Sequence, residues 1–436
     1  MFNSRKIKNV ADVAAWQLCC GCGACGYINP EAIEMIDTLD YGRRPRFCDG
    51  ADISSAKESM AVCPGIELNR PPMPKEMTGQ EDIYRVWGPV LGVWEGHAVD
   101  PQVRFEGSSG GVATALALYA IEKQNMAGAL HVRSRQDIPY LNQTIFSQNR
   151  RQLLAGAGSR YAPASPCDGL QQIEDAPAPC VFIGKPCDVA AIQKAMVLRP
   201  KLAEKIGLTI AFFCAGTPTT EGTLKMLQNM GVEDLESIMS LRYRGKGWPG
   251  LATAEFRDKD GTIQQRQLTY EQSWGDILQK YRQWRCYICP DHIGEFADIA
   301  VADAWHRKAT EHQPGRSVII ARTKRGKEMI ENAIESGYLE AGVVTSGILP
   351  QCRPGQAEYQ GKLWARLKTL KMMGVAIPSY RGFNFYRLWR SELLMKEKIH
   401  SVFSTVKRVF VKKLLKPKRI KPLFGIHETN TRVRER

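Results

Sequence analysis

The spacing of the cysteines constrains this chain more than any other feature. The 436 residues include 13 cysteines. Three patterns stand out: Cys19-x2-Cys22-x2-Cys25, Cys63-Pro64 and Cys286-x2-Cys289. Such spacings are typical of iron–sulfur proteins. In a reducing compartment thiols stay free, so an odd number of cysteines favours metal ligation or catalysis over a disulfide framework. We therefore expect a redox protein that carries a cluster.

The amino-terminal sequence gives no sign of export. Residues 1–10 are polar and basic, and residues 11–18 are too short and too mixed for the apolar part of a secretory signal. The longest apolar run, near residues 206–215, falls well short of the ~20 residues that cross a bilayer. We expect a cytoplasmic protein without a membrane span.

The positive charge is concentrated at the carboxyl end. Residues 362–436 hold 20 Lys and Arg against 4 Asp and Glu, whereas the whole chain has a net charge of +15. This segment alternates cations with aromatic and aliphatic residues, a pattern typical of helices on anionic membranes. We predict a peripheral association with the inner membrane surface. A basic helical extension packed on the body, disordered after Pro422, is the alternative. Nucleic-acid binding is disfavoured because no recognised motif accompanies the charge.

Short apolar runs alternate with helical segments between residues 81 and 360. The expected strands are residues 181–184, 208–213, 298–301 and 317–322, and residues 111–123 are expected to form a helix. The fold class predicted is α/β (mixed α+β). A proline-rich linker at residues 70–74 separates a small ferredoxin-like module (1–80) from a larger α/β domain (81–360), and a basic, partly amphipathic helical extension follows (361–436).

The run that begins at Cys19 matches the bacterial ferredoxin pattern C-x2-C-x2-C-x3-C-P with one change, because Asn29 stands where the fourth cysteine is expected. A full two-cluster module is therefore not expected, and Cys63 can complete a single [4Fe-4S] cluster. The predicted ligands are Cys19, Cys22, Cys25 and Cys63, with Cys20 and Cys48 as substitutes. Tetrahedral zinc also suits four thiolates, and cysteines without any ligand are a third alternative.

A second group of cysteines is spread over the α/β region. Cys187 and Cys214 each follow a predicted strand, and Cys286 and Cys289 form a C-x-x-C loop. Ligands gather beyond the carboxyl ends of strands in open α/β sheets, so these thiols could hold a second [4Fe-4S] cluster. A thiol–disulfide pair at the C-x-x-C loop is the competing interpretation. The isolated cysteines are expected to be packed in the core: Cys167, Cys180 and Cys352.

A glycine–serine segment directly precedes the helix expected at residues 111–123. Glycines let the backbone approach an anion, and free N–H groups at a helix start attract negative charge. The predicted phosphate cradle consists of Gly107, Ser108, Ser109, Gly110 and Gly111. A simple helix cap is the alternative. Further hydroxyl groups and cations for a pyrophosphate are expected from Ser159, Arg160, Tyr161 and Lys185.

The segment from Arg244 to Trp248, with Lys246 between glycines, combines cations and an aromatic ring that suit a planar anion. An ordinary surface turn is equally compatible with it. Asp303 ends a predicted strand, where a carboxylate can orient a cofactor or cap a helix. His292 and His306 are expected to be structural.

Taken in order, these motifs resemble the coenzyme F420 hydrogenase/dehydrogenase beta-subunit family over roughly residues 15–325. The segments that carry the resemblance are residues 19–25, 107–111, 158–161, 183–187, 213–216, 244–248 and 286–299. The resemblance implies FAD at the glycine–serine loop and strengthens the second cluster at Cys187, Cys214, Cys286 and Cys289.

In that family the flavin exchanges a hydride with F420 or another two-electron partner, while clusters pass single electrons. We therefore predict an iron–sulfur flavoprotein oxidoreductase with FAD and one or two [4Fe-4S] clusters, and with F420, ferredoxin or a similar redox partner. The alternative is a membrane-associated accessory or scaffold protein of envelope polysaccharide biosynthesis, with a structural metal or cluster. No residue is assigned as a general acid or base.

Overall fold

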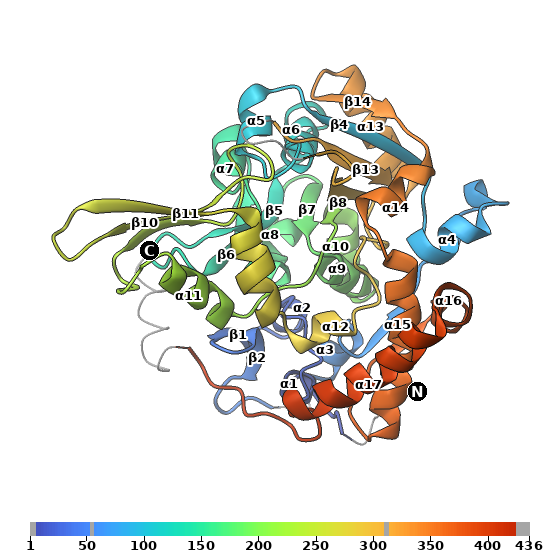
Figure 1. Ribbon diagram of the computed structural model, residues 1–436. Coiled ribbons are helices and arrows are strands. Elements are labelled where there is room, and N and C mark those ends of the chain that lie inside the picture. The colour runs from blue at the N-terminus through green and yellow to red at the C-terminus, as the bar shows by residue number, and fades with distance from the viewer. Residues whose placement is uncertain (1–5, 53–55, 309–313, 424–436) are drawn as a thin grey trace.

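A mixed eight-stranded sheet forms the centre of the protein (Figure 1). The computed structural model describes residues 6–52, 56–308 and 314–423. In spatial order the strands are β14 (Leu339–Val343), β4 (Gly92–Ala98), β13 (Ser317–Ala321), β12 (Ile299–Asp303), β8 (Ile206–Phe212), β7 (Cys180–Gly184), β5 (Ala129–Ser134) and β6 (Asn142–Ser147). The four strands from β12 to β5 are parallel, and the flanking strands are antiparallel. The predicted mixed α/β class is confirmed.

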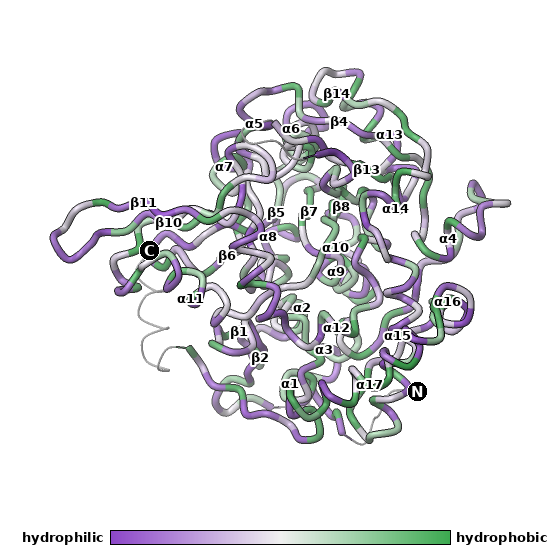
Figure 2. The backbone as a smooth tube through the Cα atoms, viewed as in Figure 1, coloured by the Kyte–Doolittle hydropathy of each residue, from purple (hydrophilic) through white to green (hydrophobic). Residues whose placement is uncertain are grey.

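The central strands are continuous apolar runs because both faces of the sheet are covered. Every residue of β7 and of β13 is buried, as expected for strands with helices on both sides. Strands β7 and β8 are also largely hydrophobic in Figure 2. All four strands expected from the sequence are present, and so is the predicted helix, as α6 (Val112–Lys123).

Helices cover the two faces of the sheet. Helix α6 and helix α13 (Lys324–Glu335) share one apolar core with the sheet. Helix α9 (Pro186–Leu198) packs in a second core, which also takes in Ala24 and Tyr27 from the amino-terminal segment. The predicted cysteine run is therefore packed directly against the α/β body.

The amino-terminal segment consists of α1 (Val10–Ala15), α2 (Ala24–Ile28), the hairpin of β1 (Ile33–Thr38) and β2 (Gly42–Phe47), and α3 (Lys57–Ala61). A separate three-stranded sheet, β9 (Ile238–Arg242), β10 (Ala252–Arg257) and β11 (Ile263–Leu268), projects to one side in Figure 1. The remaining helices are α4 (Glu81–Trp87), α5 (Pro101–Glu106), α7 (Arg150–Ala155), α8 (Gln171–Glu174), α10 (Pro200–Lys205), α11 (Thr220–Asn229), α12 (Trp284–Tyr287) and α14 (Leu349–Cys352).

The carboxyl-terminal segment folds back onto the amino-terminal one. It contains α15 (Gln356–Met372), α16 (Phe385–Glu392) and α17 (Met395–Val411), and its short strand β15 (Ser379–Arg381) pairs in parallel with β3 (Glu67–Asn69). Leu363 and Val409 pack in one core with Leu18 and Trp284. The described part of this segment packs on the body, its last helix ends at Val411, and residues 412–423 continue without a helix. The disorder expected after Pro422 falls mainly on residues 424–436, outside the described residues. Among the described residues, no helix is long and apolar enough to cross a bilayer.

Candidate functional site

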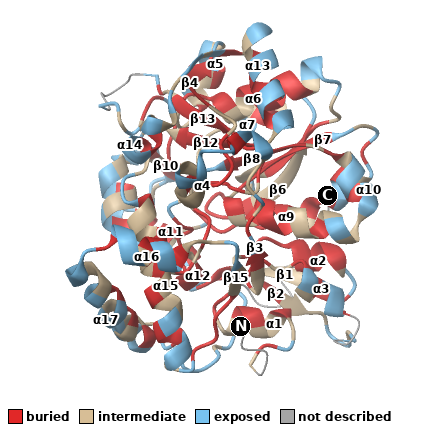
Figure 3. Cartoon of the chain, turned by 90° about the vertical axis from the view of Figure 1, so that its right-hand side faces the viewer, coloured by how far each residue is buried: buried red, intermediate tan, exposed pale blue. Residues whose placement is uncertain are grey.

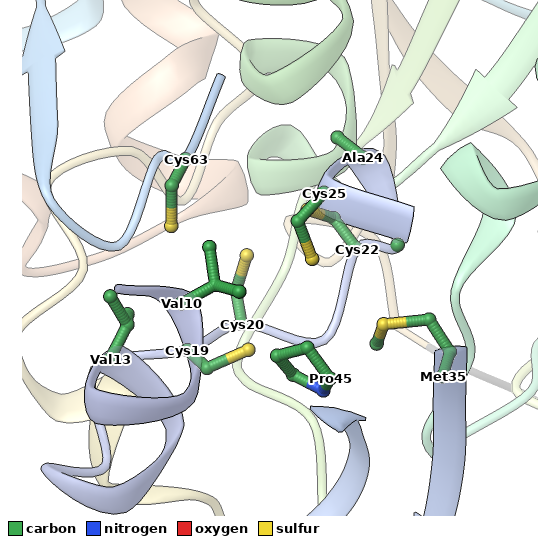
Figure 4. A pocket seen from close by; sticks show the side chains of 11 residues that line it. Val10, Val13, Cys19, Cys20, Cys22, Ala24, Cys25, Met35, Pro45 and Cys63 are labelled. Atoms are coloured by element: carbon green, nitrogen blue, oxygen red, sulfur yellow. The ribbon is translucent and has the colours of Figure 1, made fainter. Parts of the chain in front are cut away.

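Five cysteines line one small cavity in the amino-terminal segment, beside apolar residues such as Val10 and Pro45 (Figure 4). Cys19, Cys20 and Cys22 lie in the turn between α1 and α2, Cys25 lies on α2, and Cys63 follows α3. In Figure 4 the sulfur atoms of Cys19, Cys20, Cys25 and Cys63 point into the same space. The structure thus gathers the four predicted ligands, and it adds Cys20. Cys48 does not line the cavity.

Four of these five thiols have a raised pKa, those of Cys19, Cys22, Cys25 and Cys63, and Cys20 is the exception. Burial raises the pKa of Cys63 to about 12. Burial also raises the pKa of Cys25, and the neighbouring Cys19 and Cys63 add to the effect. Several thiols packed together in a buried site are costly to ionise, and the nearby cations, Arg44 and Arg285 at Cys19 and Lys194 at Cys63, offset only part of that cost. A bound cation or cluster would relieve that cost, because metal ligation deprotonates thiols.

The five thiols are not arranged around a single ion. Within the described ranges, no three His, Cys, Asp or Glu side chains converge closely enough to hold one metal ion. A [4Fe-4S] cluster is larger than an ion, so its four thiolates stand farther apart. The cluster predicted from the sequence and its zinc alternative therefore both remain predictions.

Asn29, which replaces the fourth ferredoxin cysteine, has a structural partner instead. Its Nδ2 donates to Ser59 Oγ at 2.7 Å, and Ser59 Oγ donates to the carbonyl of Cys25 at 2.9 Å. The substitution thus ties α2 to α3 and fixes the backbone of Cys25 within the cysteine run.

The second cysteine group assembles at the carboxyl ends of β7 and β8. Cys187 lies in the first turn of α9, directly after β7, and Cys214 follows β8. Burial raises the pKa of Cys214 and of Cys289, and the nearby Cys286 adds to both increases. Backbone N–H groups of Gly216 and Thr217 point to the sulfur atoms of Cys214 and Cys286, at 3.4 and 3.3 Å.

Cys20 connects the two cysteine groups. Hydrogen bonds with Cys187 and Cys22 lower the pKa of Cys20 well below its usual value. Cys22 in turn contacts Cys167, a residue expected only to be packed in the core. Arg285 links the groups a second time, since its guanidinium donates to the carbonyls of Pro64 at 3.0 Å and Ile288 at 3.2 Å. The two groups are therefore contiguous.

The C-x-x-C loop is held by side chains from the carboxyl-terminal segment. The Tyr359 hydroxyl lies 3.2 Å from the carbonyl of Cys286 and 3.1 Å from that of Cys289. Arg366 donates to the carbonyl of Tyr287 at 2.9 Å, and Tyr380 donates to that of Ile288 at 2.8 Å. Every carbonyl of this loop therefore has a partner, and three of the partners lie beyond residue 355.

His292 belongs to the same support. Arg353 Nη2 donates to its Nδ1 at 2.7 Å, its Nε2 lies 3.3 Å from the Cys286 carbonyl, and its ring stacks on Tyr359. Burial, reinforced by Arg353, lowers the pKa of His292 well below its usual value. A neutral imidazole that donates to a backbone carbonyl fits the structural role expected for this histidine.

The glycine–serine loop joins α5 to α6, and it is fastened to the sheet. Ser109 Oγ donates to the carbonyl of Arg316 at 2.8 Å, and the N–H of Gly110 donates to Ser317 Oγ at 3.0 Å. A Cβ at position 110 would come 2.9 Å from the carbonyl oxygen of Gly96. Ser109 and Gly110 thus attach the loop to the start of β13 and the end of β4. No side chain caps the start of α6, so these residues do not act as the helix cap considered as the alternative.

Ser108 faces the other predicted segments. Its Oγ accepts from the N–H of Ser159, and its carbonyl accepts from Arg244 Nη2 at 2.5 Å. Arg244 pairs with Asp303 at 2.8 Å, and Trp248 Nε1 donates to the same carboxylate at 2.9 Å. The loops at residues 107–111, 158–161 and 244–248 therefore meet at the end of β12, as the sequence predicts for one site.

Aromatic rings surround this meeting point. Trp305 packs on Trp248 with ring centroids 5.2 Å apart and stacks on Tyr270 at 5.1 Å, and 38% of Trp305 remains exposed. The Tyr161 hydroxyl accepts from Arg244 Nη1 at 3.0 Å. An exposed indole beside buried charges suits a planar anionic ligand.

The predicted cations occupy different places. Lys246 is exposed and lies in the loop beside Trp248. The guanidinium of Arg160 instead bonds inside the protein, to Asn142 Oδ1 at 2.8 Å and to the carbonyl of Pro139 at 2.9 Å. Lys185 pairs with Asp188 at 2.6 Å and lies near Cys187 and Cys20. Of these three, only Lys246 keeps a free ammonium group beside the loops.

Cysteines gathered at the carboxyl ends of parallel strands, with a glycine-rich loop at the end of the neighbouring strand β12, define a class of cysteine-rich α/β proteins. Residues 93–171 and 179–346 match the models of the amino-terminal and carboxyl-terminal parts of one family, described as "Coenzyme F420 hydrogenase/dehydrogenase, beta subunit". Together they cover more than half of the chain. This chain belongs to the coenzyme F420 hydrogenase/dehydrogenase beta-subunit family, and thus to a family of redox-enzyme subunits.

The curated relatives are distant. The coenzyme F420 hydrogenase beta subunit of Methanosarcina barkeri is 22% identical over 56% of this chain and 78% of its own length. The coenzyme F420-dependent sulfite reductase of Methanocaldococcus jannaschii is 24% identical over 76% of this chain and 47% of its own length, so the matched part is about half of that enzyme. The coenzyme F420 hydrogenase beta subunit of Methanothermobacter thermautotrophicus is 21% identical over 66% of this chain and 99% of its own length.

A solved structure is also similar. A chain of the F420-reducing [NiFe] hydrogenase complex from Methanosarcina barkeri superimposes with a TM-score of 0.47 at 19% identity, over 76% of this chain and 96% of that chain. The family models begin at residue 93 and end at residue 346. The cysteine run of the amino-terminal segment, and the helices that support the C-x-x-C loop, therefore lie outside the residues matched by the family models.

Proposed function

We propose that this protein is an FAD- and [4Fe-4S]-dependent oxidoreductase that couples two-electron hydride chemistry to one-electron transfer. The observation that carries the proposal is the contact between the two cysteine groups through Cys20 and Cys187 in a member of a redox family. Two separate structural metal sites would have no need to adjoin. Two electron carriers have that need, because electrons must pass from one to the other.

Each cysteine group would hold one cluster. Cys19, Cys22, Cys25 and Cys63, with Cys20 as the alternative fourth ligand, would hold the first. Cys187, Cys214, Cys286 and Cys289 would hold the second. A [4Fe-4S] cluster supplies one-electron transfer when it is bound. The arginines beside the second group, Arg285 and Arg353, would offset the negative charge of its thiolates.

FAD would lie against the loops that meet at β12. Lys246 and the hydroxyl of Ser108 would bind its phosphates, and the rings of Trp248 and Trp305 would pack on its planar portion. FAD supplies hydride transfer. Asp303 holds Arg244 and Trp248 in place. Because Ser109 and Gly110 are committed to the sheet, they would position the loop while Ser108 contacts the ligand.

The partner of the flavin follows from the named relatives, which are F420-dependent enzymes. We propose F420 as the two-electron partner and ferredoxin or a similar carrier as the one-electron partner. The proposed location is the cytoplasm, with peripheral association at the inner membrane surface. The comparisons give no support to the alternative of a scaffold protein of envelope polysaccharide biosynthesis.

The experiment is anaerobic purification of the full chain, extraction and identification of the flavin, and addition of reduced F420 while the visible spectrum is recorded. About one FAD per chain, bleached by reduced F420, supports the proposal. A chain that binds no flavin after incubation with FAD contradicts it. If the flavin is reduced only by another donor, that donor replaces F420 as the proposed partner, and the proposed flavin site is unchanged.

The flavin site is tested by Lys246→Ala. Removal of one phosphate-binding cation should weaken FAD binding about 10- to 150-fold, because a charged hydrogen bond contributes about 1.5–3 kcal/mol. Lys123→Ala is the matched control, since Lys123 is exposed at the opposite end of α6. Equal FAD affinities of the two variants, measured by fluorescence titration, would remove Lys246 from the site.

A further inference from the structure

Helix α17 turns its apolar side chains outward. The residues that it buries against the body are Ser401, Thr405 and Val409, two of which are small polar residues. Its large apolar side chains are exposed instead, and they recur at helical spacing: Met395 (70%), Ile399 (51%), Phe403 (69%) and Phe410 (61%). A helix that stabilised only the fold would bury these side chains.

Exposed large apolar side chains are concentrated in and around α17. Among the described residues, 20 large hydrophobic side chains are exposed, and 8 of them lie between Leu394 and Leu415. Figure 3 shows α17 on the outside of the molecule, with α15 between it and the body. A contiguous exposed apolar surface of this kind marks an interaction site.

Cations flank the apolar side chains. Residues 394–419 contain nine Lys and Arg and a single acidic residue, Glu397. Glu397 is bound to Lys362 of α15 at 3.0 Å, which fixes the start of α17 on the body. The outward side of α17 therefore presents apolar side chains among uncompensated positive charges.

We propose that the outward face of α17, with the basic turn at residues 412–416, is the surface by which this protein binds an anionic lipid bilayer. An amphipathic helix with aromatic and aliphatic side chains among lysines inserts its apolar face at the boundary between headgroups and acyl chains, while its cations contact anionic lipids. This inference names the surface for the peripheral association proposed above. It does not depend on the cofactors.

The shape and charge of the face favour a bilayer over a protein partner. The apolar side chains stand on one outer helix, where a flat and fluid surface can receive them all. A second copy of this chain would bring the same positive charges together, and like charges in apposition are costly. The remainder of the segment has a different role, because Leu363, Phe385 and Leu388 are buried.

Bilayer binding would also orient the molecule. Helix α17 packs on α15, and α15 carries Tyr359 and Arg366, which hold the C-x-x-C loop. The second cysteine group would therefore lie behind α15, on the side of the protein that faces the lipid.

The test is co-sedimentation of the purified full chain with two kinds of vesicle. One kind contains equal parts of phosphatidylglycerol and phosphatidylcholine, and the other contains phosphatidylcholine alone. We expect binding to the anionic vesicles at least tenfold stronger than to the neutral ones, and weaker binding at high salt. Equal binding to both kinds, or binding to neither, overturns the proposal without any variant.

Variants locate the surface. The double variant Phe403→Ser, Phe410→Ser should bind the anionic vesicles at least tenfold more weakly. The double variant Lys407→Gln, Lys413→Gln should lose about fivefold in vesicle binding for each charge removed. Ile263→Ser with Val343→Ser is the matched control, because both side chains are exposed apolar residues far from α17 in the chain. Binding unchanged in the phenylalanine pair contradicts the proposal.

Two further readouts distinguish bilayer binding from self-association and from the redox assignment. Sedimentation velocity without lipid would reveal a dimer. If the Phe403→Ser, Phe410→Ser variant abolishes that dimer and the wild-type chain does not bind vesicles, the face binds a second copy and the proposal is overturned. Flavin and iron contents of the same samples report on the redox assignment, so failure of one proposal is distinguishable from failure of the other.

Discussion

The C-x-x-C loop and the glycine–serine loop are both predicted ligand loops, yet the fold uses their polar groups in opposite ways. In the C-x-x-C loop the backbone carbonyls bond to side chains from distant segments, and the thiols of Cys286 and Cys289 gather with other cysteines. In the glycine–serine loop, the hydroxyl of Ser109 and the N–H of Gly110 bond to the start of β13. Part of that motif therefore serves the fold.

The difference shows that a motif does not assign one role to all its residues. The carbonyls of the C-x-x-C loop bond to side chains of other segments, so its two thiols are not needed to attach the loop to the carboxyl-terminal helices. The glycine–serine loop is attached to the sheet by two of its own residues, Ser109 and Gly110. Ser108 faces the loops at residues 158–161 and 244–248 instead. Variants at the two loops should therefore differ in kind: cofactor loss at the first, and loss of folding stability at Ser109 or Gly110.

The largest effect is expected for Cys286→Ser. If the second group holds a cluster, loss of one thiolate should remove about four iron atoms per chain and leave the first cluster in place. Iron and sulfide analysis of anaerobically purified protein measures this. Cys48→Ser is the control, because Cys48 lies outside the first cavity, and the charges that act on it come from Glu34, Arg46 and Asp49. Equal iron contents of the two variants would exclude a second cluster at Cys286.

Gly110→Ala should destabilise the protein by about 1–3 kcal/mol, because the new Cβ would overpack against the carbonyl oxygen of Gly96. Urea unfolding measures the change. Gly342→Ala is the matched control, since a Cβ there meets no atom within 4 Å. A Gly110→Ala variant as stable as the control, but without FAD, would show that Gly110 contacts the flavin and that the structural assignment is wrong.

The smallest effect is expected for Tyr359→Phe. Loss of the hydroxyl leaves the carbonyls of Cys286 and Cys289 without this partner, which should cost about 1 kcal/mol of unfolding free energy. Iron release to a chelator should accelerate, because the loop that carries two ligands is less firmly held. Tyr386→Phe serves for comparison, as Tyr386 is 54% exposed. Identical release rates in the two variants would mean that α15 does not support the loop.

The elements that the sequence predicts well are those whose signal is local. Residues 181–184 and 317–322 are apolar, β-branched runs, and such runs form buried strands wherever both faces are covered. The C-x-x-C pair and the run at residues 19–25 are recognisable because their spacing itself carries the chemistry. The meeting of the loops at residues 107–111, 158–161 and 244–248 does not follow from local signals, because the first two loops come after helices and the third comes after a strand of the smaller sheet.

The remainder depends on packing between distant segments. Helix α15 buries Gln356, Gln360 and Thr369 together with leucines, so its sequence has no clear apolar stripe to show which face meets the body. Arg160 follows a glycine and a serine, a pattern that predicts a cation bound to an anion. In the structure its guanidinium instead donates to the backbone carbonyls of residues 139 and 241, which are distant in the chain. Cys20 stands outside the three-residue spacing, and only the contact with α9 places it between the two cysteine groups.

The central claim is that the two adjoining cysteine groups hold two [4Fe-4S] clusters. The most direct measurement is the content of iron, acid-labile sulfide and zinc in the anaerobically purified wild-type chain. The claim predicts about eight iron and eight sulfide per chain with no stoichiometric zinc. Stoichiometric zinc without iron would contradict it and assign the cysteines to structural metal sites.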